Sequence, residues 1–296
     1  MKDENGKAQK SPRKSKKEGR RIKTMPGMSI VEPFIMRERT DATNYFAGTV
    51  EVSHAEEYIR KKQQEGLTGF NMMHVFIATY VRAVAKYPQM NRFIRGQRIY
   101  ARNNIEVMIT VKKEMKVESP DTVVKMIYPI DATAEDVYRI TTEEIAKARA
   151  DDTGDFDVLV KILRFIPRFG MRGFMALLRF LDYYGWLPRR LTKLSPFHGS
   201  FAITSMGSLG IPPIYHHLYN FGNIPIFLAF GVKYRKNELQ RDGSVKTLHC
   251  VDYRITTDER IADGYTYATA LKYMRGIYGH PEVLDERPAE IREDIP

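Results

Sequence analysis

The stretch from Leu248 to Leu284 reads LHCVDYRITTDERIADGYTYATALKYMRGIYGHPEVL and decides the fold. Its residues 250–257 alternate β-branched or aromatic residues with polar ones, which predicts a strand. A charged turn follows at residues 258–260, and after residues 263–264 apolar residues recur at helical spacing. This order of strand, charged turn and helix is typical of sites that present polar side chains into a cleft, and equally of ordinary α/β surfaces.

The turn resembles the motif of a known family. Residues 258–264 read Asp-Glu-Arg-Ile-Ala-Asp-Gly. They resemble Asp-His-Arg-x-x-Asp-Gly, which is typical of the family that contains chloramphenicol acetyltransferase and the catalytic domains of the dihydrolipoyl acyltransferases. Every fixed position matches except the histidine, where Glu259 stands.

Further passages resemble the same family in the same order. Residues 71–87 predict a buried helix that stops at a Pro-x-x-Asn passage, residues 88–91. Residues 199–210, GSFAITSMGSLG, resemble Thr-Phe-Thr-Ile-Ser-Asn-Leu-Gly-x-x-Gly, and the apolar strand at residues 224–231 resembles Ala-Ile-Leu-Gly-Val-Gly. The matches extend over about residues 30–290.

The resemblance implies an α/β fold: a two-layer sandwich with a mixed β-sheet, chloramphenicol acetyltransferase-like. It also implies a trimer whose active sites lie in tunnels between neighbouring subunits. We expect a disordered basic tail at residues 1–25 and one catalytic domain at residues 26–296, with a helical insert at about 155–195. A chain of 296 residues is long enough to bury one substantial core.

Composition is that of a soluble globular protein, with 43% hydrophobic and 28% charged residues. The single cysteine, Cys250, excludes an intramolecular disulfide and a cysteine-built metal site, and it fits a reducing cytosol. No apolar run is long enough to span a membrane, and no secretory signal is recognisable. No metal-ligand spacing, P-loop or dinucleotide fingerprint occurs. We therefore expect a cytoplasmic protein without a metal, and leave membrane association open.

Residues 1–25 carry most of the net charge of +11 and lack apolar periodicity. Such a tail can contact anionic lipid, an acidic partner or nucleic acid, or it can simply keep a protein soluble. Because the rest of the chain is only mildly basic, nucleic acid is not an expected partner.

The insert at residues 155–195 is apolar with interspersed arginines, and Pro167 and Gly170 predict a break between two helices. A basic amphipathic hairpin can lie on an anionic membrane. It can also pack on its own domain with its arginines reaching water, or bury against another subunit. The sequence leaves these alternatives open.

The resemblance assigns chemistry to four residues: Thr204, Ser205, Glu259 and Asp263. Acyl transfer from a coenzyme A thioester needs a base for the acceptor's proton and a hydrogen-bond donor for the oxyanion. In the family a histidine is the base and a serine hydroxyl is the donor; Thr204 matches that serine, with Ser205 adjacent. Asp263 matches the aspartate that holds the active-site loop, and Arg37 or Arg39 is its candidate partner.

Glu259 has two interpretations. A glutamate is a poorer base than imidazole at neutral pH, because its ordinary pKa is near 4.3. Burial in a tunnel raises a carboxyl pKa, which would suit a base. Alternatively, Glu259 forms an ion pair with Arg260 or another arginine.

Residues 216–222, HHLYNFG, imitate His-His-x-x-x-Asp-Gly with Phe221 in the aspartate position. They fall where the family has a loop, so we interpret His216 and His217 as packing or rim residues. A place near the tunnel is the other possibility, because the loop follows the turn after Thr204.

Two functions remain. The first is an acyl-CoA-dependent acyltransferase that acts on a hydroxyl, amine or thiol acceptor and uses the coenzyme A thioester directly, since the chain has no room for a lipoyl domain. The second is a catalytically inactive trimeric scaffold or ligand-binding descendant of the same family. Coenzyme A-binding residues, acyl chain and acceptor are not identifiable from the sequence.

Overall fold

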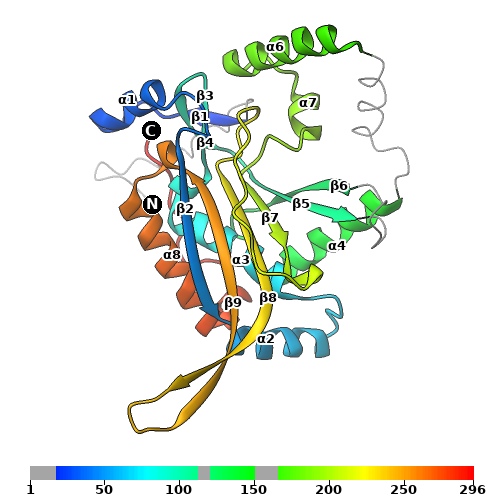
Figure 1. Ribbon diagram of the computed structural model, residues 1–296, viewed down its shortest axis with the longest axis vertical. Coiled ribbons are helices and arrows are strands. Elements are labelled where there is room, and N and C mark those ends of the chain that lie inside the picture. The colour runs from blue at the N-terminus through cyan, green and yellow to red at the C-terminus, as the bar shows by residue number, and fades with distance from the viewer. Residues whose placement is uncertain (1–17, 113–120, 151–165) are drawn as a thin grey trace, which may run out of the picture.

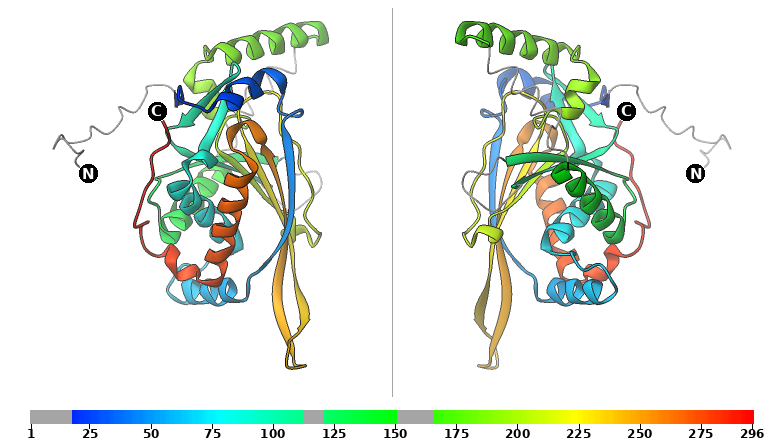
Figure 2. Two further views of the ribbon diagram at one scale, coloured as in Figure 1. Left: turned by 90° about the vertical axis from the view of Figure 1, so that its left-hand side faces the viewer. Right: turned by 90° about the vertical axis from the view of Figure 1, so that its right-hand side faces the viewer.

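The computed structural model describes residues 18–112, 121–150 and 166–296 (Figure 1). Their main feature is a six-stranded mixed sheet covered on one face by helices, so the predicted two-layer α/β sandwich is confirmed (Figure 2). The covering helices are α2 (Ser53–Gln64), α3 (Met72–Lys86), α4 (Ala134–Ala150) and α8 (Gly264–Gly279).

The strand order is β2-β9-β8-β7-β5-β6. The strands are β2 (Thr43–Glu51), β5 (Ile105–Lys112), β6 (Asp121–Tyr128), β7 (Phe201–Ser205), β8 (Ile226–Leu239) and β9 (Val245–Asp258). The central strand β7 runs parallel to β5 and β8, and every other pair is antiparallel. Because β7 is flanked on both sides, its carboxyl end is held in the middle of the sheet.

A second, three-stranded sheet has the order β1-β4-β3, from β1 (Gly19–Arg21), β4 (Arg98–Arg102) and β3 (Arg92–Arg95). The expectation that disorder extends to residue 25 is therefore wrong, because β1 pairs with β4 and Ile22 is buried. The first seventeen residues of the predicted tail lie outside the described residues.

The two faces of the large sheet differ. Phe201 and Ile203 of β7 point into the main core below the helices, as alternation requires. Ala202 points the other way, into a small cluster with Met108 and Phe227. No helix of the described residues covers that other face (Figure 2), and we call it the open face.

Beyond the sheet, β8 and β9 continue as a two-stranded hairpin that projects from the molecule (Figure 1). The turn between the two strands, residues 240–244, forms its tip. The arm exposes apolar side chains, with Leu239 73% and Val245 62% exposed. An isolated hairpin is marginally stable in water, so this arm has the character of a contact element.

Ser53 and Glu56 have the sequence spacing of a capping box at the start of α2, but the structure does not form one. The N-cap is Val52 and makes no side-chain cap bond. The Ser53 hydroxyl accepts from the backbone N–H of His249, and Glu56 binds Lys233 and His249. Both side chains that a capping box would use are therefore bound to residues of the sheet instead.

The insert is described from residue 166 onward. It contains α6 (Arg168–Tyr184), which starts after Pro167, and α7 (Arg189–Leu194). The break predicted at Gly170 is wrong, because Gly170 lies inside α6. The chain instead breaks at Gly185, which ends α6 with a positive φ of 70°. The predicted helix before Pro167 lies largely in residues 151–165, outside the described residues.

Candidate functional site

The motif turn is held by Asp258, which is fully buried. Arg260 donates to both of its carboxylate oxygens, at 2.8 and 2.7 Å, and Arg39 Nε lies 3.9 Å away. Arg260 also donates to the carbonyl oxygens of Met36 and Arg37. Burial lowers the pKa of Arg39 to about 10, and the carboxylate of Asp258 opposes that effect. These three residues therefore lock the turn to the segment that follows α1 (Gly27–Ile35).

Glu259 opens a short 3₁₀ turn between these partners, and its side chain is exposed. The ion pair of Glu259 with Arg260 is contradicted, because Asp258 occupies that guanidinium. The neighbours of Glu259 are acidic: partial burial and the charges of Glu259 and Asp263 raise the pKa of Glu32. The structure thus displays Glu259 on the surface of a single chain.

Asp263 does not pair with Arg37 or Arg39, so the expected arginine partner of this residue is wrong. Arg39 is taken by Asp258, and the Asp263 side chain accepts from the backbone N–H of Thr266 at 2.7 Å. These hydrogen bonds to Thr266 lower the pKa of Asp263. Asp263 is thus the N-cap of α8 and fixes where the helix starts after the turn.

Thr204 and Ser205 lie at the carboxyl end of β7, and their side chains point to opposite faces of the sheet. Thr204 shares the open face with Ala202 by alternation. Ser205 lines a cleft of about 410 Å³ on the helical side, together with Glu56, Arg60, Met72 and Lys233 among others. Of the two hydroxyls, only Thr204 faces the side of the sheet that no helix covers.

The structure does not bring Thr204 and Glu259 together within one chain. Thr204 pairs with Ala229, and Ala229 pairs with Arg254 of β9. Asp258 ends β9 four residues beyond Arg254, which is about 14 Å further along the strand. The predicted donor and the predicted base therefore belong to two separate places.

The histidine loop, residues 211–225, lies on the open face. The His216 ring stacks on Phe227 of β8 at 3.8 Å between centroids, and Thr256 donates to the His216 carbonyl oxygen. The ring of Tyr215 lies 5.4 Å from the Arg254 guanidinium. His216 thus packs, as interpreted from the sequence, and it does so on the same face as Thr204. Burial lowers the pKa of His216.

A polar cavity of about 160 Å³ lies beside the motif turn. Sequence reasoning missed it, because its walls come from distant segments. They are residues 37–39, the turn between β3 and β4, α6, residues 220–222 and Arg260. Three of its arginines, Arg37, Arg95 and Arg179, are not bound to Asp258.

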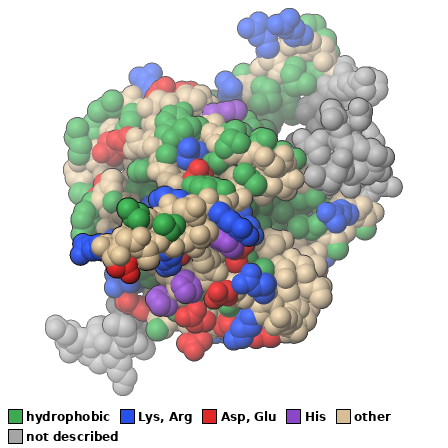
Figure 3. Space-filling model, turned by 60° about the horizontal axis from the view of Figure 1, so that its bottom comes forward, with side chains coloured by type: hydrophobic (Ala, Val, Ile, Leu, Met, Phe, Trp, Pro, Cys, Tyr) green, Lys and Arg blue, Asp and Glu red, His purple; other side chains and the backbone are tan. Residues whose placement is uncertain are grey.

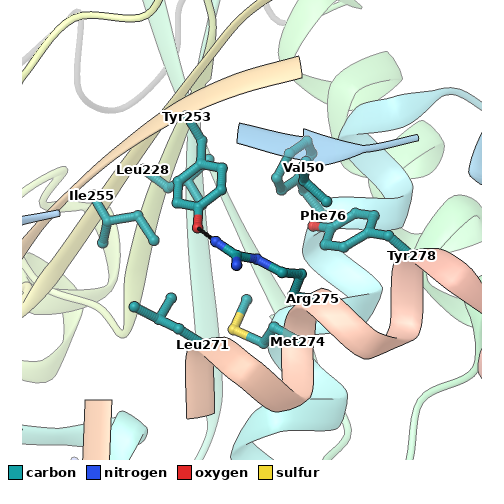
Figure 4. A pocket seen from close by; sticks show the side chains of 9 residues that line it. All are labelled: Val50, Phe76, Leu228, Tyr253, Ile255, Leu271, Met274, Arg275 and Tyr278. Carbon is teal, nitrogen blue, oxygen red and sulfur yellow. Dashed lines mark hydrogen bonds between the residues drawn. The ribbon is translucent and has the colours of Figure 1, made fainter. Parts of the chain in front are cut away.

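A small apolar void lies between the large sheet and α8 (Figure 4). It measures about 20 Å³, and Arg275 closes it by donating to the Tyr253 hydroxyl at 3.4 Å. No predicted site residue lines it. A space of this size holds about one water molecule, so we assign the void to the core.

No protein-family model matches the chain, and no curated protein matches it in sequence. Its fold does match solved structures. A probable dihydrolipoamide acetyltransferase from Listeria monocytogenes has a TM-score of 0.56 at 16% identity, covering 87% of this chain and 94% of that one. The cubic core of a pyruvate dehydrogenase multienzyme complex has a TM-score of 0.55 at 11% identity, covering 89% and 93%. Chloramphenicol acetyltransferase has a TM-score of 0.51 at 14% identity, covering 88% and 99%.

These similarities extend over nearly the whole length of each partner and confirm the fold that the resemblance implied.

Proposed function

We propose that this chain transfers an acyl group from a coenzyme A thioester to a hydroxyl, amine or thiol acceptor. The observation that carries the proposal is the position of Thr204. Its hydroxyl stands on the open face at the end of a central parallel strand, in a fold whose solved examples include acetyltransferases.

The Thr204 hydroxyl is the proposed oxyanion donor. A fixed donor aimed at the developing charge of a tetrahedral intermediate is a major source of rate in acyl transfer. Thr204 is suitable because β5 and β8 hold its strand on both sides. Ser205 faces the helical side, and we assign it no contact with the same oxyanion.

Glu259 is the proposed base, and we assign it to a second copy because the strand register separates it from Thr204 within one chain. In one chain the two groups are too far apart to act on one substrate, whereas a neighbouring subunit can place its Glu259 against an open face. Contact with that face would also bury Glu259, which raises a carboxyl pKa toward the range of an effective base.

A trimer supplies such an arrangement, and two features support it. The β8–β9 hairpin exposes Leu239 and Val245 on an arm with no neighbour in its own described chain. One structural relative is the core of a multienzyme complex. Within this assembly Asp263 is a positioning residue, because capping α8 fixes the turn that carries Glu259.

The alternative is an inactive trimeric scaffold or ligand-binding descendant. It is favoured by one observation: Asp258, Arg260 and Asp263 all have structural partners. The match to the family motif is therefore explicable by folding alone, and the missing histidine then marks a lost base.

We place the protein in the cytoplasm, in keeping with a single free and buried cysteine, Cys250. Among the helices of the described residues, none has the length and apolar character needed to cross a bilayer. Peripheral contact with an anionic membrane is part of the proposal, and within the described residues α6 and α7 are its elements.

The test is release of free thiol from acetyl-, butyryl- and palmitoyl-coenzyme A with a panel of acceptors, measured for wild type, Glu259→Ala and Glu259→His. Coenzyme A binding is measured in parallel by calorimetry. Turnover by the wild type that Glu259→Ala abolishes would support carboxylate-based transfer.

A gain of activity only in Glu259→His would mean an intact site whose base has been lost. Absence of both turnover and coenzyme A binding in every variant would overturn the proposal and leave the scaffold.

A further inference from the structure

We infer that the end of the molecule formed by α1 and α6 is a docking surface for anionic lipid membranes, and that the arginine-lined cavity beside α6 takes a lipid headgroup. This inference rests on the membrane contact proposed above for α6 and α7 and extends it to α1 and to the cavity; it does not depend on acyl transfer.

The first observation is the outer face of α6. Phe169, Leu177, Phe180 and Tyr184 share one helical face by their spacing and are between 50% and 80% exposed. Trp186 follows the helix, is 63% exposed and stacks on Tyr184. Exposed aromatic and aliphatic groups in this pattern are typical of helices that lie in the membrane interface.

The second observation is α1, which the sequence did not single out. Met28, Phe34 and Ile35 are each more than half exposed. The helix lies at the same end of the molecule as α6 (Figures 1 and 2). One residue links them: Gln97 donates to the Pro33 carbonyl oxygen of α1 at 3.3 Å and accepts from the Tyr183 hydroxyl of α6 at 2.6 Å. The two apolar helices therefore belong to one surface.

The third observation is charge. The cationic side chains of α6 and α7 are Arg168, Arg172, Arg179, Arg189, Arg190 and Lys193. The only acid from residue 166 to residue 194 is Asp182, whose carboxylate lies 3.2 Å from Nε2 of buried His198. By contrast, the end that carries the β8–β9 hairpin intersperses side chains of both signs (Figure 3). The α6–α7 segment is thus complementary to anionic lipid.

The cavity adds the specific element. Arg37, two residues after α1, and Arg179 of α6 line it, and neither has an ion-pair partner among the described residues. Arg95 lines it too, and its buried Nε has no hydrogen-bond partner there either, although its guanidinium binds Glu18. Two acids, Glu38 and Asp182, also line the cavity, and Asp182 is paired with His198. A phosphate group would give the arginines charge-assisted acceptors, and the volume of about 160 Å³ admits a headgroup.

The experiment is flotation of the full chain with vesicles of phosphatidylcholine alone and of phosphatidylcholine with phosphatidylglycerol. We expect binding only to the anionic vesicles, weakened by salt. Phe180→Asp with Leu177→Asp should reduce binding at least tenfold, and Arg179→Glu at least fivefold, since each basic residue at such a surface contributes about that factor. Val283→Asp and Lys272→Glu, at exposed positions outside both this surface and the hairpin, are matched controls that should bind as the wild type does.

Four outcomes would overturn the inference. The first is no binding to anionic vesicles, and the second is equal binding to both vesicle types. The third is saturation by free inorganic phosphate with no vesicle binding, which would make the cavity a site for a soluble anion. The fourth is a change of oligomeric state in Phe180→Asp, measured by sedimentation, with vesicle binding retained, which would make the face a subunit contact. Circular dichroism confirms that each variant is folded.

Discussion

Asp258 and Arg260, on either side of exposed Glu259, bind each other inside the protein through two hydrogen bonds from the guanidinium, one to each carboxylate oxygen, and a third from the Arg260 backbone N–H. This pair joins the two ends of a three-residue turn. Arg39 lies beside Asp258, and Arg260 donates to the backbone carbonyl oxygen of Met36 after α1. The middle residue of the turn is thereby displayed without contributing to the lock. Chemistry at Glu259 and stability of the turn should therefore be separable by mutation.

Asp258→Asn is expected to lower the free energy of unfolding by about 3–5 kcal/mol, because it leaves buried guanidinium groups without their carboxylate. Glu259→Gln, on the exposed middle position, should change it by about 0.5 kcal/mol or less. Urea unfolding of both variants measures the difference. Similar losses in the two variants would contradict a structural role confined to Asp258.

Thr204→Val should lower kcat for thiol release about 10²–10³-fold with little change in KM, since it removes the oxyanion donor and keeps the β-branched shape. Thr204→Ser should retain most of the rate. Ser205→Ala is the control, because its side chain lies on the other face of the sheet. If Ser205→Ala lost as much rate as Thr204→Val, the assignment of Thr204 as the oxyanion donor would be contradicted.

Sites shared between subunits should complement one another. Thr204→Val and Glu259→Ala are each expected to be inactive as pure proteins. Coexpressed in equal amounts, they should regain about a quarter of the wild-type rate per site, the fraction of interfaces with both groups intact in a randomly mixed oligomer. Zero recovery, with mixed oligomers demonstrated by affinity tags, would mean that both groups act within one chain.

The buried carboxylate of Glu18 predicts a pH dependence of stability. Burial raises its pKa, but the charges of Arg95 and Arg102 outweigh burial and lower it from 4.5 to about 2. Its stabilising contribution is therefore complete above pH 4.5 and is lost as the pH falls toward 2. Glu18→Gln should cost ~3 kcal/mol at pH 7.

The difference between wild type and Glu18→Gln should narrow as the pH is lowered to 4 and below, as followed by urea unfolding. Glu51→Gln, at an exposed position, serves as the control. A difference that stays constant with pH would show that Glu18 is not held ionised by its arginines.

The sequence predicted the strands that have one buried face, and it missed the segments of strand that have no buried face. The strand at residues 250–257 was predicted because it alternates against a core, whereas β9 starts five residues earlier, at Val245. The first three of those residues, 245–247, belong to the projecting hairpin, where both faces are exposed and no alternation of apolar and polar residues is needed. The strand Gly19–Arg21 was missed for a related reason: three residues with two arginines carry no period.

At the site, the oxyanion-donor role of Thr204 stays a prediction, whereas the partners that the sequence suggested for the charged residues are wrong. The apolar residues Phe201 and Ile203 imply that Thr204 faces away from the core, which the structure agrees with. One interpretation of Glu259 was an ion pair with Arg260 or another arginine, whereas buried Asp258, two positions before Arg260, binds that guanidinium. Ion-pair partners depend on burial, which adjacent positions in a turn do not reveal.

Because Thr204 and Ser205 are adjacent hydroxyl residues, β7 would keep a hydroxyl on the open face even if its register shifted by one residue. A slip of one residue turns every side chain of a strand to the opposite face. Here such a slip would exchange one hydroxyl for another on the open face, so a donor would persist even in a mispaired chain. The pairing of β7 with β5 and β8 must then be selected by its apolar residues, Phe201 and Ile203, which a slip would expel from the core.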